Sequence, residues 1–104
     1  MASGRLGAVT LATANTTIYG PSAATSYAVV SVSICNSNGS SVTVRLAIST
    51  TATPGVNDYI EYGVTIPANA TLERTGLVLS NGNYLVGYSS NASGVSAVAY
   101  GIEN

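Results

Sequence analysis

The chain has 104 residues, the usual length of one compact domain, and is 46% hydrophobic but only 7% charged. It contains no Lys and no His and has a formal net charge of −1, which argues against nucleic acid or an anionic membrane as a partner because both attract basic surfaces. A single cysteine, Cys35, excludes an intrachain disulfide and a cysteine-based metal cluster.

Alternation of apolar and polar side chains with a period of two predicts eight strands, and no segment has a sustained helical period. In chain order the predicted strands span residues 5–13, 16–19, 26–35, 41–49, 59–66, 71–79, 83–89 and 95–102. The clearest is SVTVRLAIS, whose apolar side consists of Val42, Val44, Leu46 and Ile48. In the fifth strand, Ile60, Tyr62, Val64 and Ile66 are predicted on one side, and Tyr59 and Glu61 on the other.

The segments between these strands, such as NSNGSS, TTATPGVN, PANA and SNGN, carry the Gly, Pro, Asn and Ser residues of turns. About eight short strands at this spacing predict an all-β fold, with one antiparallel β-sandwich of jelly-roll type over residues 1–104. The predicted core residues are Val30, Val32, Val44, Leu46, Ile60 and Val64.

The surface is expected to be neutral and rich in hydroxyl groups, because Ser, Thr and Asn together make up 35 residues. A near-zero net charge is unfavourable for the solubility of a free monomer. The composition therefore favours a protein that works in an assembled state, and a homo-oligomer, with a trimer preferred, is predicted.

Glu61 and Glu73 are the first candidates for chemistry, because paired carboxylates perform acid–base catalysis in glycosidases. If PANA closes a hairpin, Ile66 faces Thr71, Glu73 lies opposite Val64, and Glu61 lies further along the same outward face. The favoured interpretation is a pair of exposed carboxylates that keep a strand soluble and pair with Arg45 or Arg74.

No catalytic residue, cofactor or metal is predicted. Without His or Lys, the usual bases that activate a Ser or Thr nucleophile are missing, and Cys35 is expected to be a small packed residue. The cluster Asn57, Asp58 and Glu61 is the only metal candidate, and it lacks the spaced carboxylates of a dedicated calcium loop.

Several segments resemble small virion structural proteins of tailed bacteriophages, particularly those of aquatic and cyanobacterial hosts. The similar features are the start SGRLGAVTL, a CNSNGSSVTVRLAI hairpin, the YIEY strand, the IPANATLERTGLVLSNG connection and a closing strand that ends in YGIE. The resemblance covers nearly the whole chain, and its motifs are structural.

The resemblance implies a non-enzymatic capsid decoration (cement) protein that binds the major capsid protein and stabilises the head. The alternative is a tail, fibre or baseplate component, with a receptor- or glycan-contacting module as one form. A carbohydrate-binding domain outside any phage is a third alternative, and an enzyme is least favoured. The expected location is the virion, after synthesis in the host cytoplasm without secretion.

The predicted contacts with partners combine outward residues with the N-terminal segment, whose Arg5 can reach an acidic surface. The candidate interaction residues are Arg5, Tyr59, Glu61, Glu73 and Arg74.

Overall fold

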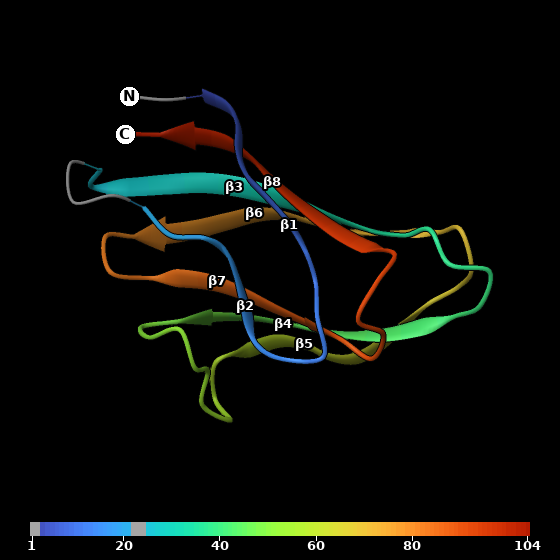
Figure 1. The fold of residues 1–104 in the computed structure, drawn as a ribbon. Coiled ribbons are helices and arrows are strands. Elements are labelled where there is room, and N and C mark those ends of the chain that lie inside the picture. Colours follow the sequence, from blue (N-terminus) through green and yellow to red (C-terminus); the bar gives the residue numbers. More distant parts are fainter. Residues whose placement is uncertain (1–2, 22–24) are drawn as a thin grey trace.

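The computed structural model describes residues 3–21 and 25–104, which contain eight strands and no helix (Figure 1). The strands are β1 (Ser3–Thr10), β2 (Thr16–Tyr19), β3 (Tyr27–Asn36), β4 (Val42–Ser49), β5 (Tyr59–Ile66), β6 (Thr71–Ser80), β7 (Tyr84–Ser89) and β8 (Val95–Glu103). The predicted all-β class is confirmed. The largest difference in strand bounds is at β1, which was predicted over residues 5–13.

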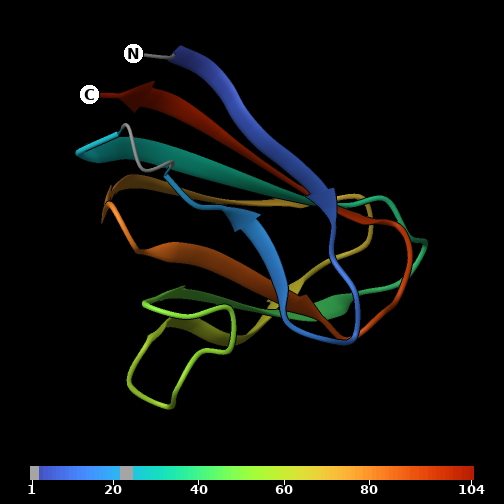
Figure 2. The same cartoon turned by 60° about the vertical axis from the view of Figure 1, so that its left-hand side comes forward.

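Two antiparallel four-stranded sheets form a sandwich, with strand orders β1-β8-β3-β6 and β2-β7-β4-β5 (Figures 1 and 2). The predicted two-sheet sandwich is confirmed. Pairing is nested, since β1 pairs with β8, β2 with β7, β3 with β6 and β4 with β5. Rolling up one long antiparallel hairpin produces this order, which is compatible with the predicted jelly-roll type.

Among the eight strands of the described residues, only β4 and β5 are both consecutive in the chain and paired with each other. NSNGSS links β3 of the first sheet to β4 of the second, and PANA links β5 back to β6 of the first sheet. The two hairpins predicted at these segments are therefore wrong. Ile66 pairs with Val42 and does not face Thr71. The prediction failed because Gly, Pro and Asn residues occur both in turns within one sheet and in links between two sheets.

The buried side chain of Asn36 joins these two links. Its amide nitrogen donates hydrogen bonds to the carbonyl oxygens of Ser40 at 3.0 Å and of Ile66 and Pro67 at 3.1 Å each. Its Oδ1 atom accepts from the backbone N–H of Asn38 at 3.0 Å. A buried amide that satisfies carbonyl groups of both links fixes the end of the sandwich.

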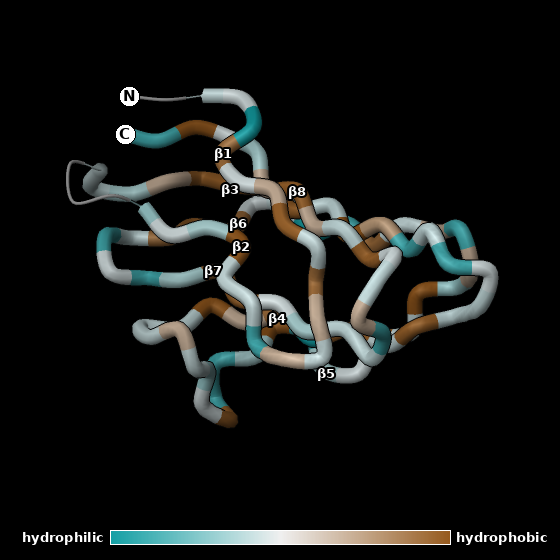
Figure 3. Tube along the Cα trace, viewed as in Figure 1, coloured by the Kyte–Doolittle hydropathy of each residue, from teal (hydrophilic) through white to brown (hydrophobic). Residues whose placement is uncertain are grey.

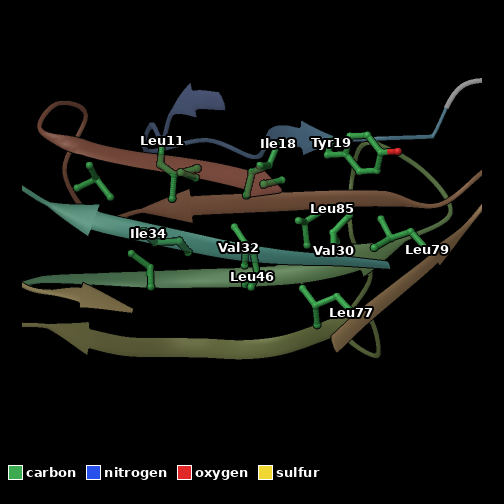
Figure 4. Close-up of a cluster of buried hydrophobic side chains, with 14 of the residues drawn as sticks. Leu11, Ile18, Tyr19, Val30, Val32, Ile34, Leu46, Leu77, Leu79 and Leu85 are labelled. Carbon is green, nitrogen blue, oxygen red and sulfur yellow. The ribbon is translucent and has the colours of Figure 1, made fainter. Parts of the chain in front are cut away.

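The core lies between the two sheets, and apolar residues from both contribute to it (Figures 3 and 4). Four of the predicted core residues are fully enclosed: Val30, Val32, Val44 and Leu46. Ile60 and Val64 are only partly buried and pack against the core from β5, which is an edge strand.

A one-residue bulge at Gly63 exchanges the faces of Glu61 and Tyr62, and a second register shift between Glu61 and Tyr59 returns Tyr59 to the outer face. Val44 lies opposite Val64 but Arg45 lies opposite Tyr62, which leaves Gly63 unpaired with a φ of 71° that favours glycine. Tyr62 is consequently exposed on the outer face, and Glu61 lies opposite Leu46 on the inner face. The prediction that Tyr62 points inward and Glu61 outward is wrong for this reason.

Candidate functional site

A cation lies between two aromatic rings on the outer face of the second sheet. Arg45 on β4 is opposite Tyr62 on β5 and Tyr88 on β7. Its guanidinium carbon lies 4.4 Å from the ring centroid of Tyr62 and 4.5 Å from that of Tyr88. Within the described residues Arg45 therefore contacts tyrosine rings and not a carboxylate, and this stacked row holds the Tyr62 ring in place.

An open hollow adjoins this row. The rings of Tyr59 and Tyr62 are 4.9 Å apart at an angle of 84°, so they form a corner with two aromatic walls. Together with Pro54 and Val56 they line a hollow of about 570 Å³. We call this site the tyrosine hollow.

The loop between β4 and β5 supplies the two aliphatic residues of the tyrosine hollow, and it projects beyond the second sheet (Figure 2). The loop is closed on itself at its end. The Asp58 carboxylate accepts a hydrogen bond from the Gly55 N–H at 2.7 Å, and the Asp58 N–H donates to the Gly55 carbonyl at 3.1 Å. This turn fixes the position of Val56 relative to the start of β5.

The seven tyrosine hydroxyls divide into two groups. Those of Tyr19, Tyr27 and Tyr100 bond to the side chains of Glu103, Asn104 and Glu73 respectively. Within the described part of the chain, four others have no protein partner, and all four belong to β5 or β7 of the second sheet: Tyr59, Tyr62, Tyr84 and Tyr88. Their register places them on the outer face, so this face presents phenol groups that can bond to a ligand.

An exposed apolar row crosses the outer face of the first sheet. Val29 on β3 lies opposite Val78 on β6 and Ile102 on β8. These side chains are 37%, 60% and 54% exposed, respectively. We call Val29, Val78 and Ile102 the apolar row, which was not predicted from the sequence. The sequence feature that could have predicted the row is an apolar residue at a position that the alternation places outward. Val78, which lies between two core leucines, is an example.

The five predicted interaction residues do not form one site. Arg5 and Glu73 lie on the outer face of the first sheet, on either side of Tyr100. Arg5 is opposite Tyr100, whose hydroxyl donates to Glu73 at 3.2 Å. Tyr59 lies in the tyrosine hollow of the second sheet. The remaining two, Glu61 and Arg74, bond to each other.

Glu61 and Arg74 form an ion pair that bridges the sheets at one edge. Arg74 lies opposite Val32 on the inner face of β6, and its guanidinium also donates to the Ile60 carbonyl at 3.4 Å. The expected pairing of Glu61 with one of two arginines is thus confirmed for Arg74. Glu61 and Glu73 belong to different sheets, so they do not form a carboxylate pair.

A double-mutant cycle with Glu61→Ala and Arg74→Ala is expected to give a coupling energy of roughly 0.3–1 kcal/mol, the usual size for a half-exposed ion pair. Urea unfolding of the four proteins measures it. Arg5→Ala combined with Glu61→Ala is the control, because Arg5 lies on another face and should not couple. A coupling energy indistinguishable from that control would show that the ion pair does not stabilise the edge.

Tyr19 connects the sheets on the other side of the sandwich. It is buried on β2, and its hydroxyl donates to Glu103 on β8. Burial, this hydrogen bond and the negative charge of Glu103 raise the pKa of Tyr19 well above its usual value. The raised pKa keeps Tyr19 protonated into the alkaline range, so its hydroxyl remains a structural donor to Glu103.

The side chains of Asn57, Asp58 and Glu61, which were considered as a metal candidate and not favoured, do not converge. Asp58 bonds to Gly55, Glu61 points inward to Arg74, and no group of three ligating side chains occurs within residues 3–21 and 25–104. Cys35 is exposed on the outer side of β3, so its expected packed position is wrong. Among the residues that the structure describes, no helix could span a membrane.

No family model, curated protein or solved structure matches this chain. Two surfaces of the sandwich are candidates for binding a partner or ligand: the apolar row of the first sheet and the tyrosine hollow of the second.

Proposed function

We propose that this protein is a non-enzymatic structural protein of a tailed-phage virion, which binds the head as a capsid decoration protein. The observation that carries the proposal is the apolar row on a domain with only seven charged residues. Neighbouring apolar side chains on three strands form the kind of surface that a partner covers. A free domain usually stays soluble through surface charge, which this chain largely lacks.

The preferred partner is the major capsid protein, with other copies of this chain as neighbours. Arg5 and Glu73 lie on the same face as the apolar row, so they supply one charge of each sign beside the apolar contact. Charges at the rim of an interface fix orientation more than they add affinity. A trimer around a symmetry axis would close the association and prevent fibre growth.

The sequence resemblance to virion structural proteins supports the same class, and it also keeps a tail, fibre or baseplate component as the second candidate. The tyrosine hollow favours this alternative, because it lies on the sheet opposite the apolar row and would face outward from a component fixed through that row. Both candidates place the protein in the virion.

Co-sedimentation with emptied heads and with isolated tails tests the proposal. We expect the protein to be an oligomer on its own and to pellet with heads. Val78→Asp should abolish pelleting while the circular dichroism spectrum is retained, because it buries a charge in the contact. Thr65→Asp, on the exposed outer face of the second sheet, is the matched control and should still pellet.

Pelleting with tails alone would favour the second candidate. A monodisperse monomer that pellets with neither heads nor tails would overturn the assembly proposal.

A further inference from the structure

We propose that the tyrosine hollow binds a neutral pyranose unit of an oligosaccharide. The hollow belongs to the second sheet and the apolar row to the first, so they lie on opposite outer faces of the two-sheet sandwich. Both surfaces can therefore be occupied at the same time. The inference goes beyond the proposed function, because a decoration protein needs no sugar site.

The size of the hollow is suited to a small ligand such as a sugar ring. Its volume of about 570 Å³ lies within the usual range for small-ligand sites. The C–H groups on the face of a pyranose pack against an aromatic ring, and Tyr59 and Tyr62 offer two such walls at 84°. Pro54 and Val56 complete an apolar lining around this corner.

The polar groups of the lining side chains are hydroxyls alone. The phenol groups of Tyr59 and Tyr62 make no hydrogen bond within the described part of the chain, and each can both donate and accept. Sugar hydroxyls need partners of this kind once they leave water. Tyrosine supplies the apolar wall and the hydrogen bond from one side chain with few rotatable bonds.

The charges around the hollow favour a neutral sugar over an acidic one. None of the four lining residues is charged. Outside the lining, the Asp58 carboxylate already accepts from Gly55 and the Arg45 guanidinium already stacks on Tyr62 and Tyr88, so one charge of each sign lies nearby and each has a protein partner.

Arg45 acts as a positioning residue for this site. It is not among the lining residues, but its guanidinium stacks on the Tyr62 ring from the side of Tyr88. Tyr62 is 63% exposed, so a ring without this contact would sample several rotamers. Holding the ring before the ligand arrives lowers the entropy cost of binding.

Two-dimensional amide NMR titrations with maltohexaose, cellohexaose and a linear mannohexaose test the inference. We expect at least one of them to shift the amide signals of Val56, Tyr59 and Tyr62. Tyr62→Ala should weaken the binding by about tenfold or more, and Tyr62→Phe by less, because it removes only the hydroxyl. Tyr100→Ala, on the outer face of the first sheet, is the control and should bind like the wild type.

Arg45→Ala separates positioning from simple structural support. The substitution should weaken sugar binding several-fold while the unfolding midpoint changes little. Even without sugar, the Tyr62 ring signals should sharpen or shift to values typical of a mobile side chain.

The inference is overturned if none of the three sugars shifts these signals, if the shifts lie elsewhere, or if Tyr62→Ala binds like the wild type. Binding of a proline-rich decapeptide but of no sugar would also overturn it. Failure of the proposed function gives a different result. A protein that binds sugar but does not pellet with heads or tails would support the sugar site and contradict only the virion role. Tyr62→Ala should still pellet with heads.

Discussion

Replacing Gly101 by Ala is expected to lower the free energy of unfolding by about 3 kcal/mol or more, among the largest effects of any single substitution in this chain. Gly101 lies on β8, between β1 and β3. A Cβ atom there would stand 2.1 Å from the Val29 carbonyl oxygen and 2.9 Å from the Val30 Cα. The φ of 153° is also one that L-residues seldom adopt.

Because the obstacle is backbone of the adjacent strand, relief requires β8 to separate from β3 and breaks ladder hydrogen bonds. Urea unfolding followed by circular dichroism measures the loss. Gly39→Ala is the matched control, since Gly39 lies in the β3–β4 link with no atom within 4 Å of an added Cβ. It should change stability by no more than about 1 kcal/mol. Equal effects of the two substitutions would contradict the tight approach of β8 to β3.

Leu46→Ala is expected to cost about 2–5 kcal/mol, from the lost transfer energy of the side chain and the cavity that it leaves. Leu46 is completely buried on β4, which has paired strands on both sides, so neighbouring backbone cannot collapse into the space. Val56→Ala is the control, because Val56 is almost fully exposed and should change stability by less than about 0.5 kcal/mol. A loss for Leu46→Ala as small as that of the control would show that the faces of β4 are inverted.

The strands and four of the six predicted core residues are confirmed, because both follow from local alternation. In β3, the inward residues Val30 and Val32 are separated by the outward Ser31, and this order needs no information from elsewhere in the chain. The same reasoning located Leu46 correctly. It holds as long as a strand contains no bulge.

Local alternation failed at β5, where Gly63 interrupts the register. The interruption exchanged the faces of Glu61 and Tyr62, and with them the edge ion pair and the wall of the tyrosine hollow. A glycine in an otherwise alternating strand was the available signal.

The functional surfaces depend on pairings between distant strands. Tyr59 could be predicted as an outward contact residue, but the stacking of Arg45 between two rings requires β7 to pair with β4. The apolar row likewise requires β3 to lie between β6 and β8. Turn residues such as those of PANA do not determine whether the next strand joins the same sheet or the other one. The strand neighbours within each sheet therefore could not be predicted from the sequence.

A density map of the virion tests the central claim most directly, because it locates the protein and shows which face is covered. The proposal predicts an eight-stranded sandwich on the capsid shell, with Val29, Val78 and Ile102 against the major capsid protein or a neighbouring copy and the tyrosine hollow turned outward. A virion that lacks the sandwich on head and tail, or one that carries it with the apolar row open to solvent, would contradict the proposal.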